Sequence, residues 1–425
     1  MQTQSRVSYI WEEGMATLPY STGVSLHSHT SASKESLFLL HKMGTEAPFA
    51  GALLRCYERA SQKRSELTLD FVAANWRPPL LPRMAFDTER RQIQRLGLEA
   101  LVSLTDHDTM EAPLLLRTIS VARQIPVSVE WTAPFGRTTF HIGVHNLPSA
   151  DAIDWMRRFE QFTEDPSDAD LGALLEELDA IPQVLTILNH PVWDLHKIGN
   201  RPHGDELDRF LSENGAYVHA LELNGLRHAR ENLEVARVAG RSRHVLISGG
   251  DRHGMEANAN INLTNATSFT EFVREIRVER RSHVLFLEQY ARAWEQRILD
   301  STVDAVSDFP QFSPGWQRWD ERAFHPDADG VMRPLSELWV DGRPPIALRL
   351  AIQAVRLLRS RSLAGALSLA FPGVNRIPGM RCDVPSTISG RRSSIGRFRL
   401  GTPILASSQR VGGGVGPGED GWASR

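Results

Sequence analysis

The chain has 425 residues, of which 41% are hydrophobic and 23% are charged, and this composition excludes a mostly disordered protein. The net charge of −3 does not indicate a general nucleic-acid binder, and the two cysteines exclude a disulfide scaffold or a cysteine-cluster metal site. Because no apolar run reaches the ~18 residues of a membrane span and no signal-peptide pattern is visible, we expect a cytoplasmic protein without a transmembrane segment.

Apolar, β-branched runs predict seven strands in the first two-thirds of the chain, at residues 23–29, 100–107, 126–132, 138–145, 183–190, 217–224 and 244–251. Helical patterns lie between several of them, at 88–96, 110–123, 168–178, 205–212, 229–239 and 269–280. Since a parallel pair needs a crossover connection, this alternation predicts parallel pairing and favours a closed or nearly closed (β/α) barrel. The alternative is an open doubly wound sheet, but the first strand lacks the Gly-rich phosphate loop that would favour it.

Composition along the chain predicts four regions. Residues 1–22 form an N-terminal segment, and residues 23–290 form the barrel, interrupted at 35–83 by an insertion that we expect to be helical. A C-terminal helical extension covers 291–380, and its predicted helix at 345–369 has a polar stripe and is expected to pack its other face on its own domain. Residues 381–425 are rich in Gly, Ser and Arg and are expected to be a disordered tail.

Histidines and acids gather at the ends of the predicted strands. His27 and His29 lie two residues apart, so both imidazoles point to one side of a strand and can reach one metal ion. The other candidates at strand ends are Asp106, His107, Glu130, His141, His190, Asp251 and His253. In a barrel these ends share one mouth. Nitrogen and oxygen donors without cysteine favour Zn, Mn or Fe, and a shared carboxylate permits a two-metal site.

The order of these motifs resembles the PHP (polymerase and histidinol phosphatase) family. The resemblance rests on His-x-His at 27–29, TDHDT at 105–109, the strand-ending Glu130 and GGDRH at 249–253, together with the histidines at 141 and 190, and it covers about residues 23–287. It implies a distorted seven-stranded (β/α) barrel. It also implies a phosphoesterase in which a metal-activated hydroxide attacks a phosphomonoester, a nucleotide or a nucleic-acid end.

The resemblance also assigns metal ligands. The first ion is expected at His27, His29 and Asp251. Glu130 is expected to bridge the first ion to a second, which His141 and His190 would hold. The resemblance therefore implies at least two divalent transition-metal ions in one site.

A third ion stays an open expectation. His107 and His253 match the residues that hold a third ion in trinuclear members, but Lys34 stands near where the family has an acid or a histidine. A protonated lysine cannot ligate usefully, so we expect Lys34 to hold a substrate phosphate, with Arg252 as another cation for the phosphoryl charge. Asp106 is expected to orient His107 or to shuttle a proton.

Two other functions stay open. A metal-dependent amidohydrolase on a related barrel often carries a carboxylated lysine on a strand, and no predicted strand is centred on a lysine. A catalytically degenerate PHP module would bind or stabilise a partner, and the nearly complete ligand set argues against it. The expected substrate is a phosphorylated small molecule or nucleotide, because the net charge does not indicate nucleic acid.

Overall fold

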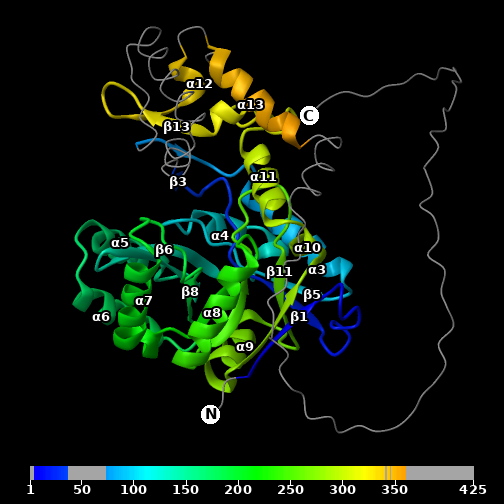
Figure 1. Ribbon diagram of the computed structural model, residues 1–425, viewed down its shortest axis with the longest axis vertical. Helices are drawn as coiled ribbons and strands as arrows, with labels where there is room; N and C mark the ends of the chain where they lie inside the picture. Colours follow the sequence, from blue (N-terminus) through cyan, green and yellow to red (C-terminus); the bar gives the residue numbers. More distant parts are fainter. Residues whose placement is uncertain (1–3, 37–72, 340–341, 345, 360–425) are drawn as a thin grey trace, which may run out of the picture. The chain divides into compact units, whose positions relative to one another are not determined.

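The computed structural model describes residues 4–36, 73–339, 342–344 and 346–359 of the chain (Figure 1). The described part has a mixed α/β architecture in which all of the described strands belong to three sheets. The body of the insertion expected to be helical, residues 37–72, and the expected tail at 381–425 lie outside the described residues. No described helix is long and apolar enough to cross a membrane.

The first sheet has five strands in the order β1-β12-β11-β2-β5. Its strands are β1 (Gln4–Tyr9), β2 (Thr22–Ser25), β5 (Glu99–Val102), β11 (Asn260–Thr264) and β12 (Arg281–Phe286). β2 pairs in parallel with β5, whereas β11 runs antiparallel to β2 and β12. The sequence did not predict β11, because its buried Asn260 and Asn262 interrupt the apolar pattern.

The second sheet has the order β10-β9-β8-β7-β6. Its strands are β6 (Val127–Phe135), β7 (Thr138–Leu147), β8 (Leu185–Asn189), β9 (Ala220–Asn224) and β10 (Val245–Gly249). β8, β9 and β10 pair in parallel as predicted, but β7 runs antiparallel to both β6 and β8. The prediction of parallel pairing is wrong for β6 and β7, because two residues between them allow a hairpin and no crossover.

Helices follow most of the strands. They are α3 (Pro82–Arg95), α4 (Glu111–Leu116), α5 (Ala152–Glu164), α6 (Asp168–Asp179), α7 (Asn200–Asn214), α8 (Ala229–Ser242) and α9 (Phe269–Arg274). Pro82 is the first residue of α3, a position whose backbone N–H has no partner within the helix, so proline loses no hydrogen bond there. The hydroxyls of Ser167 and Ser268 accept hydrogen bonds from the first turns of α6 and α9.

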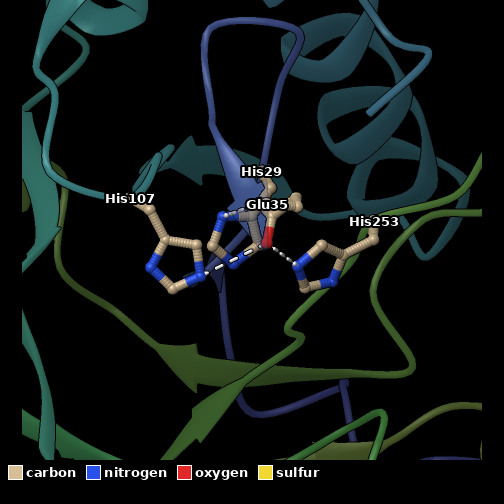
Figure 2. A group of neighbouring side chains, drawn as sticks. All are labelled: His29, Glu35, His107 and His253. Carbon is tan, nitrogen blue, oxygen red and sulfur yellow. Dashed lines mark ion pairs between the residues drawn. The ribbon is translucent and has the colours of Figure 1, made fainter. Parts of the chain in front are cut away.

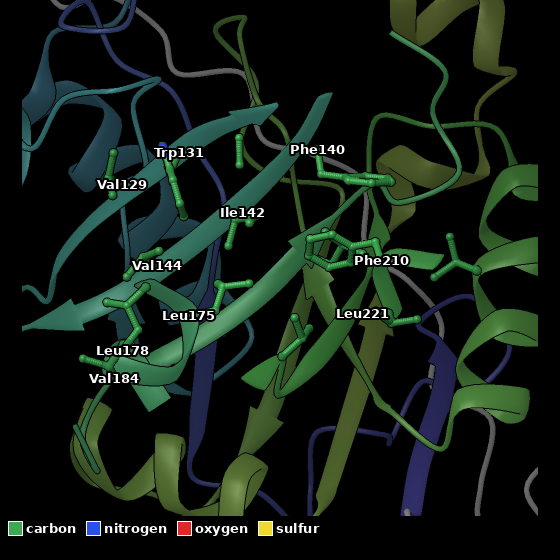
Figure 3. Close-up of a cluster of buried hydrophobic side chains, with 14 of the residues drawn as sticks. Val129, Trp131, Phe140, Ile142, Val144, Leu175, Leu178, Val184, Phe210 and Leu221 are labelled. Atoms are coloured by element: carbon green, nitrogen blue, oxygen red, sulfur yellow. The ribbon is translucent and has the colours of Figure 1, made fainter. Parts of the chain in front are cut away.

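The largest apolar cluster lies between the second sheet and its helices (Figure 3). Trp131 of β6 stacks on Phe159 of α5 with ring centroids 4.5 Å apart, and Phe140 of β7 lies 4.8 Å from Phe210 of α7. Successive side chains of a strand point to opposite faces. The burial of Trp131 in this cluster therefore directs Glu130, its neighbour in β6, to the other face of the sheet.

The C-terminal extension forms a third sheet with residues from both ends of the insertion. Its order is β14-β13-β4-β3, with β3 (Glu35–Ser36), β4 (Asn75–Trp76), β13 (Ala323–Pro326) and β14 (Met332–Pro334). Ala323, Leu335 and Trp339 of the extension pack with Trp76 in one apolar cluster. The helices of this region are α10 (Glu288–Ala291), α11 (Trp294–Ala305), α12 (Leu335–Leu338) and α13 (Ile346–Leu358).

Two isolated β-bridges connect the five-stranded sheets. Beyond the ends of β2 and β10, Ser28 pairs with Arg252, and beyond the end of β5, His107 pairs with Glu130 of β6. The predicted runs overlap β2 and β5 to β10, so each predicted strand is present. A closed seven-stranded barrel is not confirmed, because the strands divide into separate sheets that single bridges connect.

Candidate metal centre

Candidate ligands converge just beyond the ends of β2, β8 and β10. His27, His190 and Asp251 have φ angles of 59°, 29° and 53°. For residues other than glycine such backbone conformations cost roughly 1–3 kcal/mol each, and they gather at functional sites. A hydrogen bond of 2.7 Å from Asp251 N to His27 O ties two of these segments together. The fold therefore holds three candidate ligands in strained conformations.

The first donor cluster consists of His27, His29, Glu130 and Asp251. Glu130 Oε2 lies 3.0 Å from His27 Nε2 and 3.2 Å from His29 Nε2. Asp251 Oδ1 lies 3.7 Å and 3.6 Å from the same two nitrogens. Ligand atoms ~2.0–2.2 Å from a tetrahedral ion lie ~3.3–3.6 Å from one another. The spacing of the His27, His29 and Glu130 atoms is therefore compatible with one divalent ion, and Asp251 Oδ1 lies close to the two imidazoles.

Several buried donor atoms of the described residues have no hydrogen-bond partner. They include His27 Nε2, His29 Nε2, Glu130 Oε2 and His141 Nδ1. The side chains of His27, His29 and Glu130 are at most 1% exposed. A buried polar atom without a partner costs roughly 1–3 kcal/mol. A cation among the first three of these atoms would satisfy them together, so the donor set fits a metal ion.

The second donor cluster uses the other oxygen of the same carboxylate. Glu130 Oε1 lies 3.4 Å from Nδ1 of His141 on β7 and 3.2 Å from Nε2 of His190, which follows β8. Asn189 Nδ2 donates a hydrogen bond of 3.0 Å to that oxygen. The two oxygens of Glu130 thus face different pairs of imidazoles, which is the geometry of a carboxylate that bridges two ions.

The third donor cluster contains an acid that the sequence did not reveal (Figure 2). Glu35 Oε2 lies 3.1 Å from His253 Nε2 and 3.4 Å from His107 Nε2. Glu35 Oε1 lies 3.5 Å from His29 Nδ1, so the three imidazoles surround one carboxylate. Glu35 therefore adds a buried carboxylate to His29, His107 and His253, one residue after Lys34.

Lys34 and Glu35 differ in exposure because β3 begins at Glu35. Glu35 pairs with Trp76 in the third sheet and is buried, whereas Lys34 is exposed. Ser33 Oγ donates a hydrogen bond of 2.6 Å to Glu35 Oε1 and accepts one of 3.0 Å from His107 N. The sequence SASKESL carries the acid one residue later than expected. Contact of Lys34 with substrate stays a prediction.

Glu222 of β9 is a second acid that the sequence reasoning missed. Its Oε1 lies 2.5 Å from His27 Nδ1, and its Oε2 accepts a hydrogen bond of 2.7 Å from His190 N. The contact at Nδ1 directs Nε2 of His27 toward Glu130. Gly249 makes room for it, because a Cβ there would overlap the Glu222 carboxylate. A lone acid within the apolar run HALELNG is the signal that could have identified it.

Asp106 does not orient His107 in the structure. Its two carboxylate oxygens accept hydrogen bonds of 2.5 Å and 2.7 Å from N and Oγ1 of Thr30. Burial raises the pKa of Asp106 to about 6, although the nearby imidazole of His29 acts in the other direction. Asp106 therefore stabilises the turn that follows His29. Its carboxylate oxygens bind Thr30 and not His107, in contrast to the prediction.

Arg252 is also engaged away from the donor clusters. Its Nε pairs with Glu89 Oε1 of α3 at 3.0 Å, and both side chains are buried. Its other nitrogens donate hydrogen bonds of 3.0 Å and 2.9 Å to the carbonyl oxygens of Gly254 and His29. With its donors occupied in this way, Arg252 holds the ligand loops together and is not placed to neutralise phosphoryl charge.

Burial and charge set the protonation of the donors. Burial alone would raise the pKa of Glu130, but His27 and His107 outweigh it and hold that pKa well below its usual range. Burial lowers the pKa of His190 to about 4, so its imidazole is neutral and can ligate. Burial also opposes the charged form of His27, yet the carboxylates of Glu130 and Glu222 raise its pKa well above the usual value. A metal ion and a proton therefore compete for His27.

Arg227, which follows β9, is the arginine beside the ligands. Its Nη2 lies 3.3 Å from Asp251 Oδ2, and its guanidinium stacks 3.8 Å from the ring centroid of Trp193. The Trp193 ring in turn lies 5.0 Å from the ring of His190. The sequence did not single out Arg227, because its neighbours Asp251 and Trp193 lie far from it along the chain.

Comparisons with known proteins do not assign the chain to a family, so its function has to be argued from this geometry. No family model and no curated protein match the chain. An amidohydrolase from Chromobacterium violaceum with bound sulfate is 16% identical, with a TM-score of 0.30 over 43% of this chain and 86% of its own. A candidate metal-dependent phosphoesterase from Bifidobacterium adolescentis is 15% identical, with a TM-score of 0.30 over 47% and 91%. PsfC from Pseudomonas syringae is 15% identical, with a TM-score of 0.35 over 52% and 88%.

Those identities and scores carry no argument about function. What the structure itself provides is three groups of His and Glu side chains whose spacing is compatible with metal binding: His29, Glu35, His107 and His253; His27, His29 and Glu130; and His107, Glu130 and His141.

Proposed function

We propose that the chain is a metal-dependent phosphoesterase of the PHP type. One observation carries this proposal: the Glu130 carboxylate contacts all three donor clusters. Its Oε2 lies within 3.4 Å of Nε2 of His27, His29 and His107, and its Oε1 lies within 3.4 Å of His141 and His190. A buried carboxylate among five imidazoles suits a centre in which several cations share one bridging ligand.

The donor set supports two or three divalent ions of Zn, Mn or Fe, because it offers imidazole and carboxylate without thiolate. Bound ions of this kind acidify water and neutralise the charge on phosphoryl oxygens. Glu35 supports a third ion, because it adds a carboxylate to the imidazoles of His107 and His253.

The chain's own residues would orient the substrate and the ligands. Arg227 is the proposed phosphate contact, because its guanidinium lies beside Asp251 and over the ring of Trp193. A guanidinium in this position offers two parallel donors to phosphoryl oxygens. Glu222 would keep the Nε2 atom of His27 directed inward, and Asp106 would keep the turn after His29 in place.

We also propose that β2 and β5 to β10 form an interrupted seven-stranded ring. The support is that the bridges Ser28–Arg252 and His107–Glu130 join the two sheets at both junctions of this ring. Both bridges lie beside the donor clusters. The ring would correspond to residues 23–290, with the extension from residue 291 packed against the strands at the insertion.

A substrate panel tests the proposed activity. The purified chain is reconstituted separately with Mn²⁺, Zn²⁺ and Fe²⁺ and assayed on a chromogenic phosphomonoester, a phosphodiester, nucleotides and an anilide. Turnover of at least one phosphoester and its loss on chelation are expected. Turnover of the anilide alone would favour the amidohydrolase, and metal binding without any turnover would favour the degenerate module.

A further inference from the structure

The Arg227 turn, residues 225–227, follows β9 and carries the proposed phosphate contact. The N–H groups of its last two residues donate hydrogen bonds of 2.8 Å and 3.1 Å to Asn224 Oδ1. The N–H of its first residue, Gly225, donates one of 2.7 Å to the carbonyl oxygen of Gly249. The backbone donors of the Arg227 turn are therefore bound at the ends of β9 and β10.

The carbonyl oxygens of the same turn are bound from the C-terminal extension, by Arg297 of α11. Nη1 of Arg297 donates a hydrogen bond to the carbonyl oxygen of Gly225, and Nη2 donates one of 3.1 Å to that of Arg227. Arg297 is 5% exposed, and its guanidinium lies 4.4 Å from the ring centroid of Tyr290. Because a guanidinium presents its donors in a rigid planar fork, this one side chain holds both ends of the turn.

Tyr290 connects Arg297 to this segment by a second route. Asn232 Nδ2 donates hydrogen bonds of 2.8 Å to the hydroxyl of Tyr290 and to the carbonyl oxygen of Asn224. Asn232 Oδ1 accepts one of 2.8 Å from the N–H of Asn224. Residues of α8, α10 and α11 therefore hold the main chain from Asn224 through the Arg227 turn.

The placement of this main chain determines where the Arg227 side chain lies. Arg227 Nη2 lies 3.3 Å from Asp251 Oδ2, and the guanidinium lies 3.8 Å from the ring centroid of Trp193. Arg227 Nε is buried without a hydrogen-bond partner among the described residues. Since a displacement of ~1 Å in a substrate-binding group can lower turnover about 10²-fold, the backbone that carries Arg227 has to be fixed.

We propose that Arg297 is a positioning residue of the active site, through which the C-terminal extension places Arg227 against the substrate phosphate. The inference rests on the proposed function, because it takes Arg227 as the phosphate contact. Arg297 does not touch the substrate and acts through the two carbonyl oxygens of the Arg227 turn. An attachment that served stability alone would leave the affinity for substrate unchanged when it is removed from a folded chain.

Steady-state kinetics of the metal-reconstituted full-length chain on a chromogenic phosphoester test this role. Arg297→Met keeps an unbranched side chain and removes both donors. A KM about tenfold higher, with kcat within about twofold of the parent, is expected because the phosphate contact is weakened equally before and during the reaction. Arg297→Lys, which keeps the charge but offers a single nitrogen, should raise KM less.

The matched control is Arg277→Met. Arg277 also donates to backbone carbonyl oxygens, at Ile181, Val184 and Asp179, and none of these residues belongs to a donor cluster or to the Arg227 turn. Its KM should equal that of the parent.

A double-mutant cycle decides whether Arg297 acts through Arg227. In an Arg227→Met background, adding Arg297→Met or Arg297→Lys should not raise KM further, since the group being positioned is already absent. An unchanged KM in both single variants at Arg297, or effects of the two positions that add, would overturn the proposal.

Hydrogen exchange of the chelated chain measures the Arg227 turn without substrate. The amides of Leu226 and Arg227 should exchange about tenfold faster in Arg297→Met than in the parent and in Arg277→Met. Equal exchange in the three proteins would overturn the proposal. If the parent cleaves no phosphoester while exchange changes as expected, the proposed function fails and the positioning of the Arg227 turn by Arg297 stands.

Discussion

Glu130 is the residue on which the metal centre depends most, because its carboxylate contacts every donor cluster. Glu130→Gln keeps the shape of the side chain and removes the charge that lets one group serve several cations. Metal affinity should fall at least tenfold, and turnover should fall with it. The control is Glu99→Gln at the exposed start of β5, which should retain the parent's metal content. Equal metal content in both variants would contradict the assigned role.

His283 of β12 gives the fold a dependence on pH that is separate from the metal centre. Its two ring nitrogens contact Tyr20 and Ser8, and burial, aided by the charge of Arg6, lowers its pKa to about 4. In the unfolded chain His283 takes up its proton near pH ~6.5. The contribution of His283 to the free energy of unfolding is therefore complete above that pH and is lost as the pH falls toward 4.

Urea unfolding at pH 7.5 and pH 4.5 measures this contribution. In the presence of chelator, the free energy of unfolding of the parent should decrease between these values by on the order of 2 kcal/mol more than that of His283→Gln. Other histidines titrate in both proteins, so their contribution cancels in the comparison. Parallel pH dependence of the two proteins would show that His283 titrates normally in the fold.

At the residue level, the sequence identifies candidate ligands but not the two acids that lie beside them. The predicted metal-ligating residues lie together in the structure because strand ends meet, which spacing alone can indicate. Glu35 was missed because its burial depends on pairing with Trp76, which lies beyond a long insertion. Glu222 was missed because nothing local distinguishes a buried acid that contacts His27 from one that pairs with an arginine.

Among the elements, β13 links the C-terminal extension to the third donor cluster. β13 pairs with β4, β4 pairs with β3, and β3 carries Glu35. Proline within a central strand removes a ladder hydrogen bond. Ala323→Pro in β13 should therefore displace Glu35 and lower metal content by about one ion per chain, while the ions at Glu130 remain.

The control for this variant is Ala328→Pro. Ala328 lies in the turn between β13 and β14, where the N–H of Gly330 donates to the Asp327 carbonyl oxygen at 3.0 Å. Proline is favoured at the second position of such a turn. Elemental analysis should find the parent's metal content in Ala328→Pro. An unchanged metal content in Ala323→Pro would show that Glu35 is positioned without the extension.

The elements also show where local patterns are insufficient. The runs that became β2 and β5 to β10 are apolar and β-branched, so each could be recognised alone. The direction in which these strands pair could not be recognised from the runs. The antiparallel pairing of β6 and β7 depends on the turn at Gly136, whose φ of 55° suits a glycine. β1 and β12 pair with one another although they lie far apart in the sequence, and no local pattern indicates such a contact.

For the whole molecule, the sequence predicted an α/β fold with ligands at strand ends, and the structure shows a mixed α/β fold with the candidate ligands together. Closure into a barrel could not be settled from periodicity, since it depends on the bridges at Ser28 and His107. The extension beyond residue 291 makes contacts that composition did not reveal. Its β13 is connected to Glu35 through β4 and β3, and Arg297 of α11 donates a hydrogen bond to the carbonyl oxygen of Gly225 in the loop after β9.

Anomalous diffraction from crystals of the metal-reconstituted chain tests the central claim most directly. Data collected on both sides of the metal absorption edge would locate each ion. The account predicts one ion among His27, His29, Asp251 and Glu130 and a second among Glu130, His141 and His190, with ligand distances of ~2.0–2.2 Å. A third is predicted at Glu35, His107 and His253. A reconstituted crystal in which Glu130 contacts no ion would contradict the account.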